Sequence, residues 1–197
     1  MARTPSYDRN AALDAAMDLF WAKGYYATSL KDLELALQMK PGSIYAAFSS
    51  KQALFLASLE RYFQSMRDGL RADIEQAGSP LQGLAAALRS MGQTDGGPCH
   101  ACMLVKTVLG TTDMDTEIAD QARFYLDRMQ AEFRAAFEDA RGRGELPDDA
   151  DPSRLARRYQ SNFMALQIEL QRGTRPADIA ELAEDMAQET ERLCVDA

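Results

Sequence analysis

The most reactive side chains of the sequence lie in one short segment, Cys99-His100-Ala101-Cys102. Thiols and imidazoles bind zinc, but a structural zinc site needs four ligands, and one histidine with no second cluster falls short of four. We therefore predict no metal site. A second interpretation is a redox site at Cys99 and Cys102, because His100 and a helix start could lower a thiol pKa and create a sensor of electrophiles or oxidants. The simplest interpretation, which we favour, makes Cys102 a small buried apolar residue and Cys99 a passive loop residue.

Acidic side chains gather at two other places, Asp113 to Glu117 and Asp148 to Asp151. Paired carboxylates can act as general acid and base, so a helical enzyme is one alternative. Both groups lie where a helix is expected to begin or the chain to turn, however, and capping is the ordinary role of aspartate there. Since no nucleophile with a neighbouring base and no phosphate-binding loop accompanies them, we expect neither an enzyme nor a cofactor.

The elements that must position these residues are helices. Helix-forming residues dominate the 197-residue chain, Val and Ile are scarce, and 46% of the residues are hydrophobic, which predicts an all-α fold with a proper core. No run of 18 apolar residues and no signal peptide is present, so we expect a cytoplasmic protein with no membrane partner. Three cysteines without framework spacing indicate reduced thiols.

The net charge of −8 counts against a nucleic-acid partner only if it is spread evenly. Residues 1–56 carry six Lys or Arg against five Asp or Glu, a balance of +1, which leaves −9 for the remainder. This weak asymmetry fits a small DNA-contacting head on a body that DNA repels.

Apolar residues recur at helical spacing throughout the chain. Gly24, Pro41, the break at 78–80 and the Asp151-Pro152 pair mark helix ends and starts. The expected helices cover about residues 8–23, 29–37, 41–47, 51–76, 80–91, 102–109 and 115–141, with two more after Pro152 and Pro176.

Residues 28–51 have the outline of a helix-turn-helix. A short amphipathic helix, which Thr28 or Ser29 can cap, is followed by a turn of about four residues and a second short helix opened by Pro41. Ile44 and Phe48 are expected to point into the core. In such a motif the second helix lies in the major groove of DNA.

Residues 15–55 read AAMDLFWAKGYYATSLKDLELALQMKPGSIYAAFSSKQALF. This pattern closely resembles the DNA-binding domain of the tetracycline-repressor (TetR) family of bacterial transcriptional regulators, over about residues 8–60. Three elements occur in register: the LF..KGY end of the first helix, the T-S-L opening of the second, and G-S-I-Y..F..K from the third into the fourth. The resemblance implies a nine-helix homodimer, joined through helices eight and nine, whose partner is a double-stranded DNA operator.

The resemblance also implies roles for residues of the head. Lys40 is the expected main polar base reader, because its groove-facing neighbours offer only apolar or backbone contacts; DNA shape and an N-terminal arm with Arg3 are expected to help. Hydroxyls and an ammonium near a helix N-terminus are expected to bind phosphate oxygens. Gln38 stands where the family commonly has glycine, and Ala47 where it often has an aromatic residue or histidine. The implied groove-facing residues are Lys40, Pro41, Gly42 and Ala46, and the implied backbone contacts are Thr28, Ser43, Tyr45 and Lys51.

Plainer roles are open for three of these residues. Thr28 could be only a helix cap, Tyr45 could pack beneath the fourth helix, and Lys51 could be a solvated charge. Two apolar stripes near the C-terminus need a partner, which a symmetric four-helix bundle would supply. The same stripes could instead complete the core of the monomer.

The predicted domains are a DNA-binding domain at 1–50 and a ligand-binding and dimerisation domain at 51–197, linked by a helix over 51–77. The second domain is rich in aromatic and Met residues that could line an apolar cavity for a small apolar or aromatic ligand, or could fill a core. The candidate ligand-binding residues are Met91, Cys102, Met103, Tyr125, Met129, Phe133, Tyr159 and Phe163.

These observations predict a DNA-binding regulator, most simply a repressor that a small molecule releases from a palindromic operator. The alternative is a repressor that senses electrophiles or oxidants through Cys99 and Cys102. A dimeric scaffold whose head no longer binds DNA is a third possibility, which the acidic total and Ala47 allow.

Overall fold

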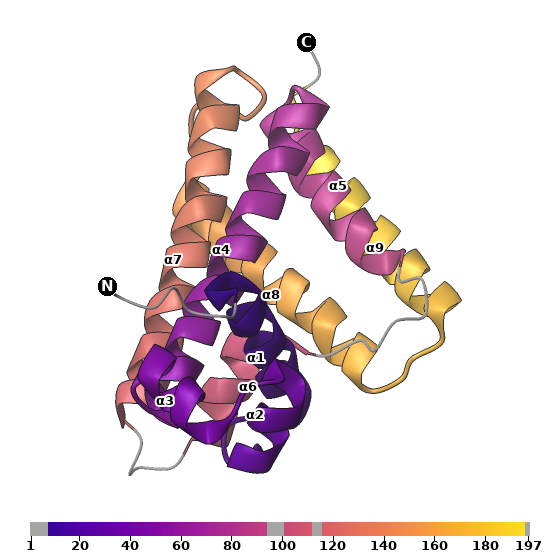
Figure 1. Cartoon of the computed structure of the whole chain (residues 1–197). Coiled ribbons are helices and arrows are strands. Elements are labelled where there is room, and N and C mark those ends of the chain that lie inside the picture. The colour runs from indigo at the N-terminus through magenta and orange to yellow at the C-terminus, as the bar shows by residue number, and fades with distance from the viewer. Residues whose placement is uncertain (1–7, 94–100, 112–115, 196–197) are drawn as a thin grey trace. The chain divides into compact units, whose positions relative to one another are not determined.

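The computed structural model describes residues 8–93, 101–111 and 116–195, and this part of the chain contains nine α-helices and no strand (Figure 1). The all-α prediction is confirmed. The helices are α1 (Arg9–Lys23), α2 (Leu30–Leu37), α3 (Pro41–Phe48), α4 (Lys51–Ala77), α5 (Pro80–Gly92), α6 (Met103–Gly110), α7 (Thr116–Gly142), α8 (Pro152–Gln171) and α9 (Pro176–Glu191).

Helix starts follow local rules that the sequence displays. Ser29, not Thr28, caps α2: its hydroxyl accepts from the Asp32 amide while the Asp32 carboxylate accepts from the Ser29 amide, a reciprocal capping box. Asp151 caps α8 ahead of Pro152, as predicted. The predicted caps Asp113 and Asp115 lie outside the described residues. Helix α7 begins at Thr116.

The chain forms two compact units, the first from residues 1–64 and 103–125 and the second from residues 65–102 and 126–197. Helices α4 and α7 contribute their first parts to one unit and the rest to the other. The predicted division into 1–50 and 51–197 is a different partition, based on function, and it stays a prediction.

Aromatic rings build the core of the first unit. Phe20 of α1 meets Phe55 of α4 edge to face at 4.9 Å between centroids, and Trp21 meets Tyr62 at 5.2 Å. Arg61 adds a two-pronged ion pair, with Nε at 2.7 Å and Nη2 at 3.1 Å from the Asp14 carboxylate. These contacts make the beginning of α4 part of the same core as α1.

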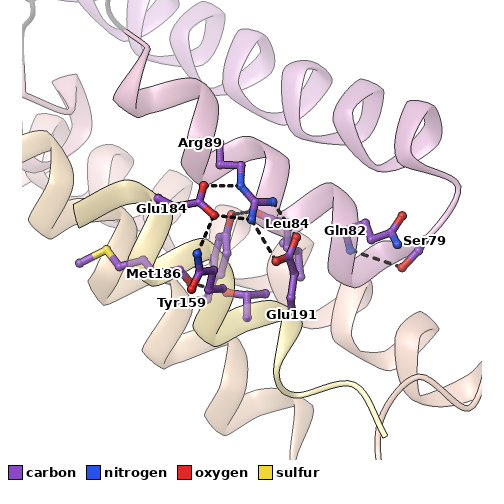
Figure 2. Close-up of polar contacts among 10 residues, drawn as sticks. Ser79, Gln82, Leu84, Arg89, Tyr159, Glu184, Met186 and Glu191 are labelled. Carbon is purple, nitrogen blue, oxygen red and sulfur yellow. Dashed lines mark hydrogen bonds and ion pairs between the residues drawn. The ribbon is translucent and has the colours of Figure 1, made fainter. Parts of the chain in front are cut away.

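In the second unit α5 and α9 lie side by side (Figure 1). A Cβ added to Gly92 would lie 2.8 Å from the Cβ of Ala183, so small residues permit this close approach. Arg89 of α5 binds two acids of α9, reaching Glu184 at 2.7 Å and Glu191 at 2.6 Å (Figure 2). Nearby, the Tyr159 hydroxyl of α8 donates to the Leu84 carbonyl at 2.7 Å.

The Arg89 ion pairs make the stability of this unit dependent on pH. Hydrogen bonds from Arg89, and then from Gln188, lower the pKa of Glu184 from 4.5 to about 2. Because the pKa is lower in the folded state, this stabilisation is fully present above about pH 4.5 and is lost as the pH falls toward 2. We expect Arg89→Met to unfold at a lower urea concentration than the wild type at pH 7, and the difference to shrink steadily below pH 4.5.

Arg158→Met is the matched control, because Arg158 pairs singly with Glu189 and both side chains are at least half exposed. It should change the urea midpoint much less than Arg89→Met does. If the difference in urea midpoint between the wild type and Arg89→Met persisted unchanged at pH 2, the stabilisation could not be assigned to the carboxylates of Glu184 and Glu191.

Among the described helices, none combines the length and the apolar character needed to span a lipid bilayer.

Candidate nucleic-acid interface

The helix-turn-helix consists of α2, a turn over 38–40 and α3. Helix α3 is short, and two of its side chains hold it to the core: Ile44, which is 1% exposed, and Phe48, which is 4% exposed. The Ser43 and Ile44 amides donate to the Lys40 carbonyl at 2.9 and 3.1 Å, which closes the first turn of the helix. The predicted inward direction of Ile44 and Phe48 is confirmed.

Gln38 takes the left-handed conformation in the turn, with φ 53° and ψ 35°. This is the conformation that glycine adopts most easily, and a side chain there costs about 1 kcal/mol. The Met39 amide donates to the Glu34 carbonyl at 3.3 Å, and the Met39 side chain is buried. The turn therefore keeps its left-handed geometry without glycine, at a small cost in stability.

The outer side of α3 is open at its N-terminal end. The side chains at this end of α3 are small or carry a single polar group. A Cβ added to Gly42 would meet nothing within 4 Å. An exposed helix N-terminus carries partial positive charge and amide donors, which favours phosphate. Of the predicted residues, Pro41 is half-buried, and those exposed on this surface are Lys40, Gly42, Ser43, Tyr45 and Ala46.

Two flanking residues predicted to contact the DNA backbone have partners within the protein. Thr28 is buried, and its hydroxyl donates to the Gly24 carbonyl at 2.7 Å, so a hydrogen bond to phosphate would require this bond to be given up. The Lys51 ammonium lies 4.5 Å from the centre of the Tyr25 ring. Burial lowers the pKa of Lys51, while the charge of Asp32 opposes that shift. Tyr25 thus holds a cation at the start of α4.

A cation that the sequence prediction missed also flanks α3. The guanidinium of Arg9 lies 5.0 Å from the centre of the Phe48 ring, and the residue is exposed. Arginine on an aromatic face keeps its charge and its donors available for phosphate. No sequence signal joins residues 9 and 48, because α1 and α3 meet only in the fold. Arg3, predicted to help read DNA, lies outside the described residues.

The predicted ligand-binding residues are divided between the two compact units, and their role stays a prediction. Tyr125 stacks on Phe63 at 5.0 Å in the first unit, while Phe133, Tyr159 and Phe163 form an aromatic cluster in the second, with Phe133 and Tyr159 at 4.7 Å. Rings in mutual contact are also what a filled core requires. Six of the eight residues are buried, and Met91 and Phe163 are half-buried. Of the eight, Met103 alone lines the cavity described next.

A cavity of about 240 Å³ lies within the first unit, between the end of α1, the loop that follows it, and α6. Its walls include Trp21 and Tyr25 on one side and Met103 and Lys106 on the other. Of its lining residues, the sequence predicts Met103 alone as ligand-binding, because the walls come from segments about 80 residues apart.

The cysteine segment is only partly visible. Cys99 and His100 lie outside the described residues, and Cys102 is 3% exposed just before α6. Within residues 8–93, 101–111 and 116–195, no three His, Cys, Asp or Glu side chains are grouped so that they could hold a metal ion.

Comparisons with known proteins point to one family. The model for bacterial regulatory proteins of the tetR family matches residues 12–58. The chain is 28% identical over 185 residues to the HTH-type transcriptional repressor ComR of Escherichia coli, covering 92% of this chain and 88% of ComR.

Solved structures agree with this result. A cysteine mutant of the TetR family regulator CifR, complexed with 26-base-pair operator DNA, is 27% identical with a TM-score of 0.85, over 95% of this chain and 98% of that one. A putative TetR regulator from a Rhodococcus species is 30% identical with a TM-score of 0.61, over 91% and 97%.

Proposed function

Because the chain belongs to the TetR family of bacterial DNA-binding transcriptional regulators, we propose that it represses transcription as a homodimer on a palindromic operator and leaves the operator when a small molecule binds. The observation that carries the proposal is the outer surface of α3. Ile44 and Phe48 hold this helix to the core, and its N-terminal end faces outward with Lys40 as the longest polar side chain.

Base reading and backbone binding fall to different residues in this proposal. Lys40 suits the acceptor edge of guanine, and Ala46 suits a thymine methyl group. Ser43, Tyr45 and Lys51 suit phosphate oxygens, which position the protein without reading sequence. Few side chains here can pair with two atoms of one base, so DNA shape contributes part of the specificity.

The dimer is proposed through α8 and α9. The inner face of α9 is occupied within the second unit, where Ile179 and Ala183 are buried. Apolar surface remains on Ile168 of α8, which is 51% exposed, and on Leu182 and Met186 of α9, which are half-buried. A two-fold axis through these helices would bury the remaining surface in a four-helix bundle and would present two α3 helices to successive turns of DNA.

Release by a reversible ligand is preferred to thiol sensing because Cys102 is buried. A thiolate must reach its electrophile, and a side chain that is 3% exposed is shielded from one. The alternative, sensing through Cys99 and Cys102, requires the buried Cys102 to become accessible.

The test is the salt dependence of DNA binding. We expect Lys51→Ala to weaken binding to operator and to random duplex alike, because a phosphate contact carries no sequence information. The slope of log K against log salt should become shallower by about one unit, since one fewer counterion is released. Fluorescence anisotropy of labelled duplexes, recorded over a series of salt concentrations, measures both quantities.

Arg134→Ala is the matched control. It removes one positive charge from an exposed position of α7, where Arg134 lies 3.6 Å from Glu138. Its salt slope should equal that of the wild type. If Lys51→Ala left affinity and slope unchanged, Lys51 would not contact phosphate; if the wild type bound no duplex at low salt, the proposed function would be wrong.

A further inference from the structure

The cavity in the first unit has the chemistry of a ligand site. Five of its thirteen lining residues are aromatic, and Trp21, Tyr25 and Phe55 are among them. Aromatic walls favour a flat ring, which can stack on them or meet them edge to face. The volume of about 240 Å³ is below the usual range for drug-sized ligands, which favours a molecule with one ring.

Lys106 supplies a positive charge at this cavity. Its ammonium donates to the Trp21 carbonyl at the end of α1, at 2.7 Å, which uses one of its three N–H donors. Burial lowers the pKa of Lys106, as expected for an ammonium drawn partly out of water. Among the described residues, those that line the cavity include no Asp or Glu.

Lys23 also lines the cavity, but its charge has a partner. The Lys23 ammonium lies 2.8 Å from the Asp32 carboxylate. A ligand anion would therefore be attracted chiefly by Lys106, and a ligand cation would be repelled.

We propose that this cavity binds a small aromatic carboxylate, with the ring between the aromatic walls and the carboxylate on the Lys106 ammonium, and that such a ligand weakens DNA binding. The second part rests on the proposed function, because it requires an operator complex that can be released.

Ligand binding and DNA binding are coupled through the loop that follows α1, which forms one wall of the cavity. Tyr25 lines the cavity with one part of its surface and carries the Lys51 ammonium at 4.5 Å from its ring centre. Gly24, another lining residue, accepts the hydrogen bond from Thr28. A ligand that displaces this loop also displaces the support of two residues proposed to contact phosphate. Ligand binding then lowers the affinity for DNA by the same factor by which DNA binding lowers the affinity for the ligand.

Trp21 is an intrinsic fluorescent probe of this site, because it lines the cavity and is the single tryptophan of the sequence. We expect benzoate at millimolar concentration to change the Trp21 emission in a saturable manner. Benzamide, which has the same ring and no charge, should bind at least tenfold more weakly. Acetate, which has the charge and no ring, should produce no saturable change.

Substitutions test the role of Lys106. Lys106→Met keeps an unbranched side chain without the charge and should weaken benzoate binding at least tenfold, whereas Lys106→Arg should retain it. Lys31→Met, at an exposed position of α2, is the charge-matched control and should bind benzoate like the wild type. If Lys106→Met fails to fold, the comparison of benzoate with benzamide on the wild type still decides the question.

Fluorescence and DNA binding separate the two parts of the proposal. No saturable change with benzoate, or equal binding of benzamide, overturns the site. Saturable, Lys106-dependent binding of benzoate that leaves operator affinity unchanged overturns the coupling. If the protein binds no operator, the proposed function fails, and the fluorescence titration still supports or overturns the site by itself.

Discussion

Replacing Gly83 with alanine should lower the free energy of unfolding of the second unit by about 3 kcal/mol, at the upper end of the range for overpacked cores. A Cβ at position 83 of α5 would lie 2.4 Å from the Ile74 Cα and 2.9 Å from the Ile74 nitrogen. These are backbone atoms of α4, so no rotamer change can relieve the clash. The helices would have to separate, and the gain of about 1 kcal/mol in helix propensity does not offset that loss.

Gly69→Ala is the matched control for this result. Gly69 also lies in a helix of the second unit, but a Cβ there would meet nothing within 4 Å. Alanine should therefore raise the free energy of unfolding by about 1 kcal/mol through helix propensity alone. Urea unfolding followed by far-UV circular dichroism measures both variants. If Gly83→Ala proved as stable as Gly69→Ala, the close packing of α4 on α5 would be wrong.

Ile44→Ala should unfold α3 and abolish operator binding. Ile44 is 1% exposed and is one of two buried side chains in the eight residues of α3. Removing a buried side chain of this size costs about 2–5 kcal/mol. A short helix held by so few contacts has little stability of its own. Urea unfolding followed by Trp21 emission reports on this unit, and anisotropy reports on operator binding.

Tyr45→Phe separates folding from recognition on the same helix. Tyr45 is 42% exposed, so loss of its hydroxyl should change the free energy of unfolding by less than about 0.5 kcal/mol. Operator binding should nevertheless weaken several-fold if the hydroxyl contacts phosphate. A Tyr45→Phe protein as unstable as Ile44→Ala would show that the outward and inward faces of α3 had been assigned the wrong way round.

Much of the fold follows from short-range rules that the sequence displays. Leu33 and Leu37, and Ile44 and Phe48, recur four residues apart, and this spacing puts each pair on one helix face whatever the rest of the chain does. Pro41 and Pro152 begin helices because proline lacks only a donor that the first turn does not use. The helix-turn-helix was predictable for the same reason, since its information lies within about 20 consecutive residues.

The same rules do not assign a role clearly where two adjacent residues could both fill it. Thr28 and Ser29 are both reasonable caps for α2, and the sequence left the choice open. In the structure Ser29 forms the capping box, while Thr28 turns inward and donates to Gly24. Local chemistry alone could not separate them, because the deciding factor is which hydroxyl is buried against the core.

Contacts between distant segments were decided only by the tertiary structure. Lys106 and Trp21 are 85 residues apart, and Arg89 and Glu191 are 102 apart. Helical spacing shows which face of a helix is apolar, but it does not show which other helix covers that face. The sequence by itself therefore determined the helices, the helix-turn-helix and the family resemblance. The tertiary structure alone brought Lys106 to an aromatic cavity and Lys51 to Tyr25, because these pairs depend on how whole helices pack and not on neighbouring residues.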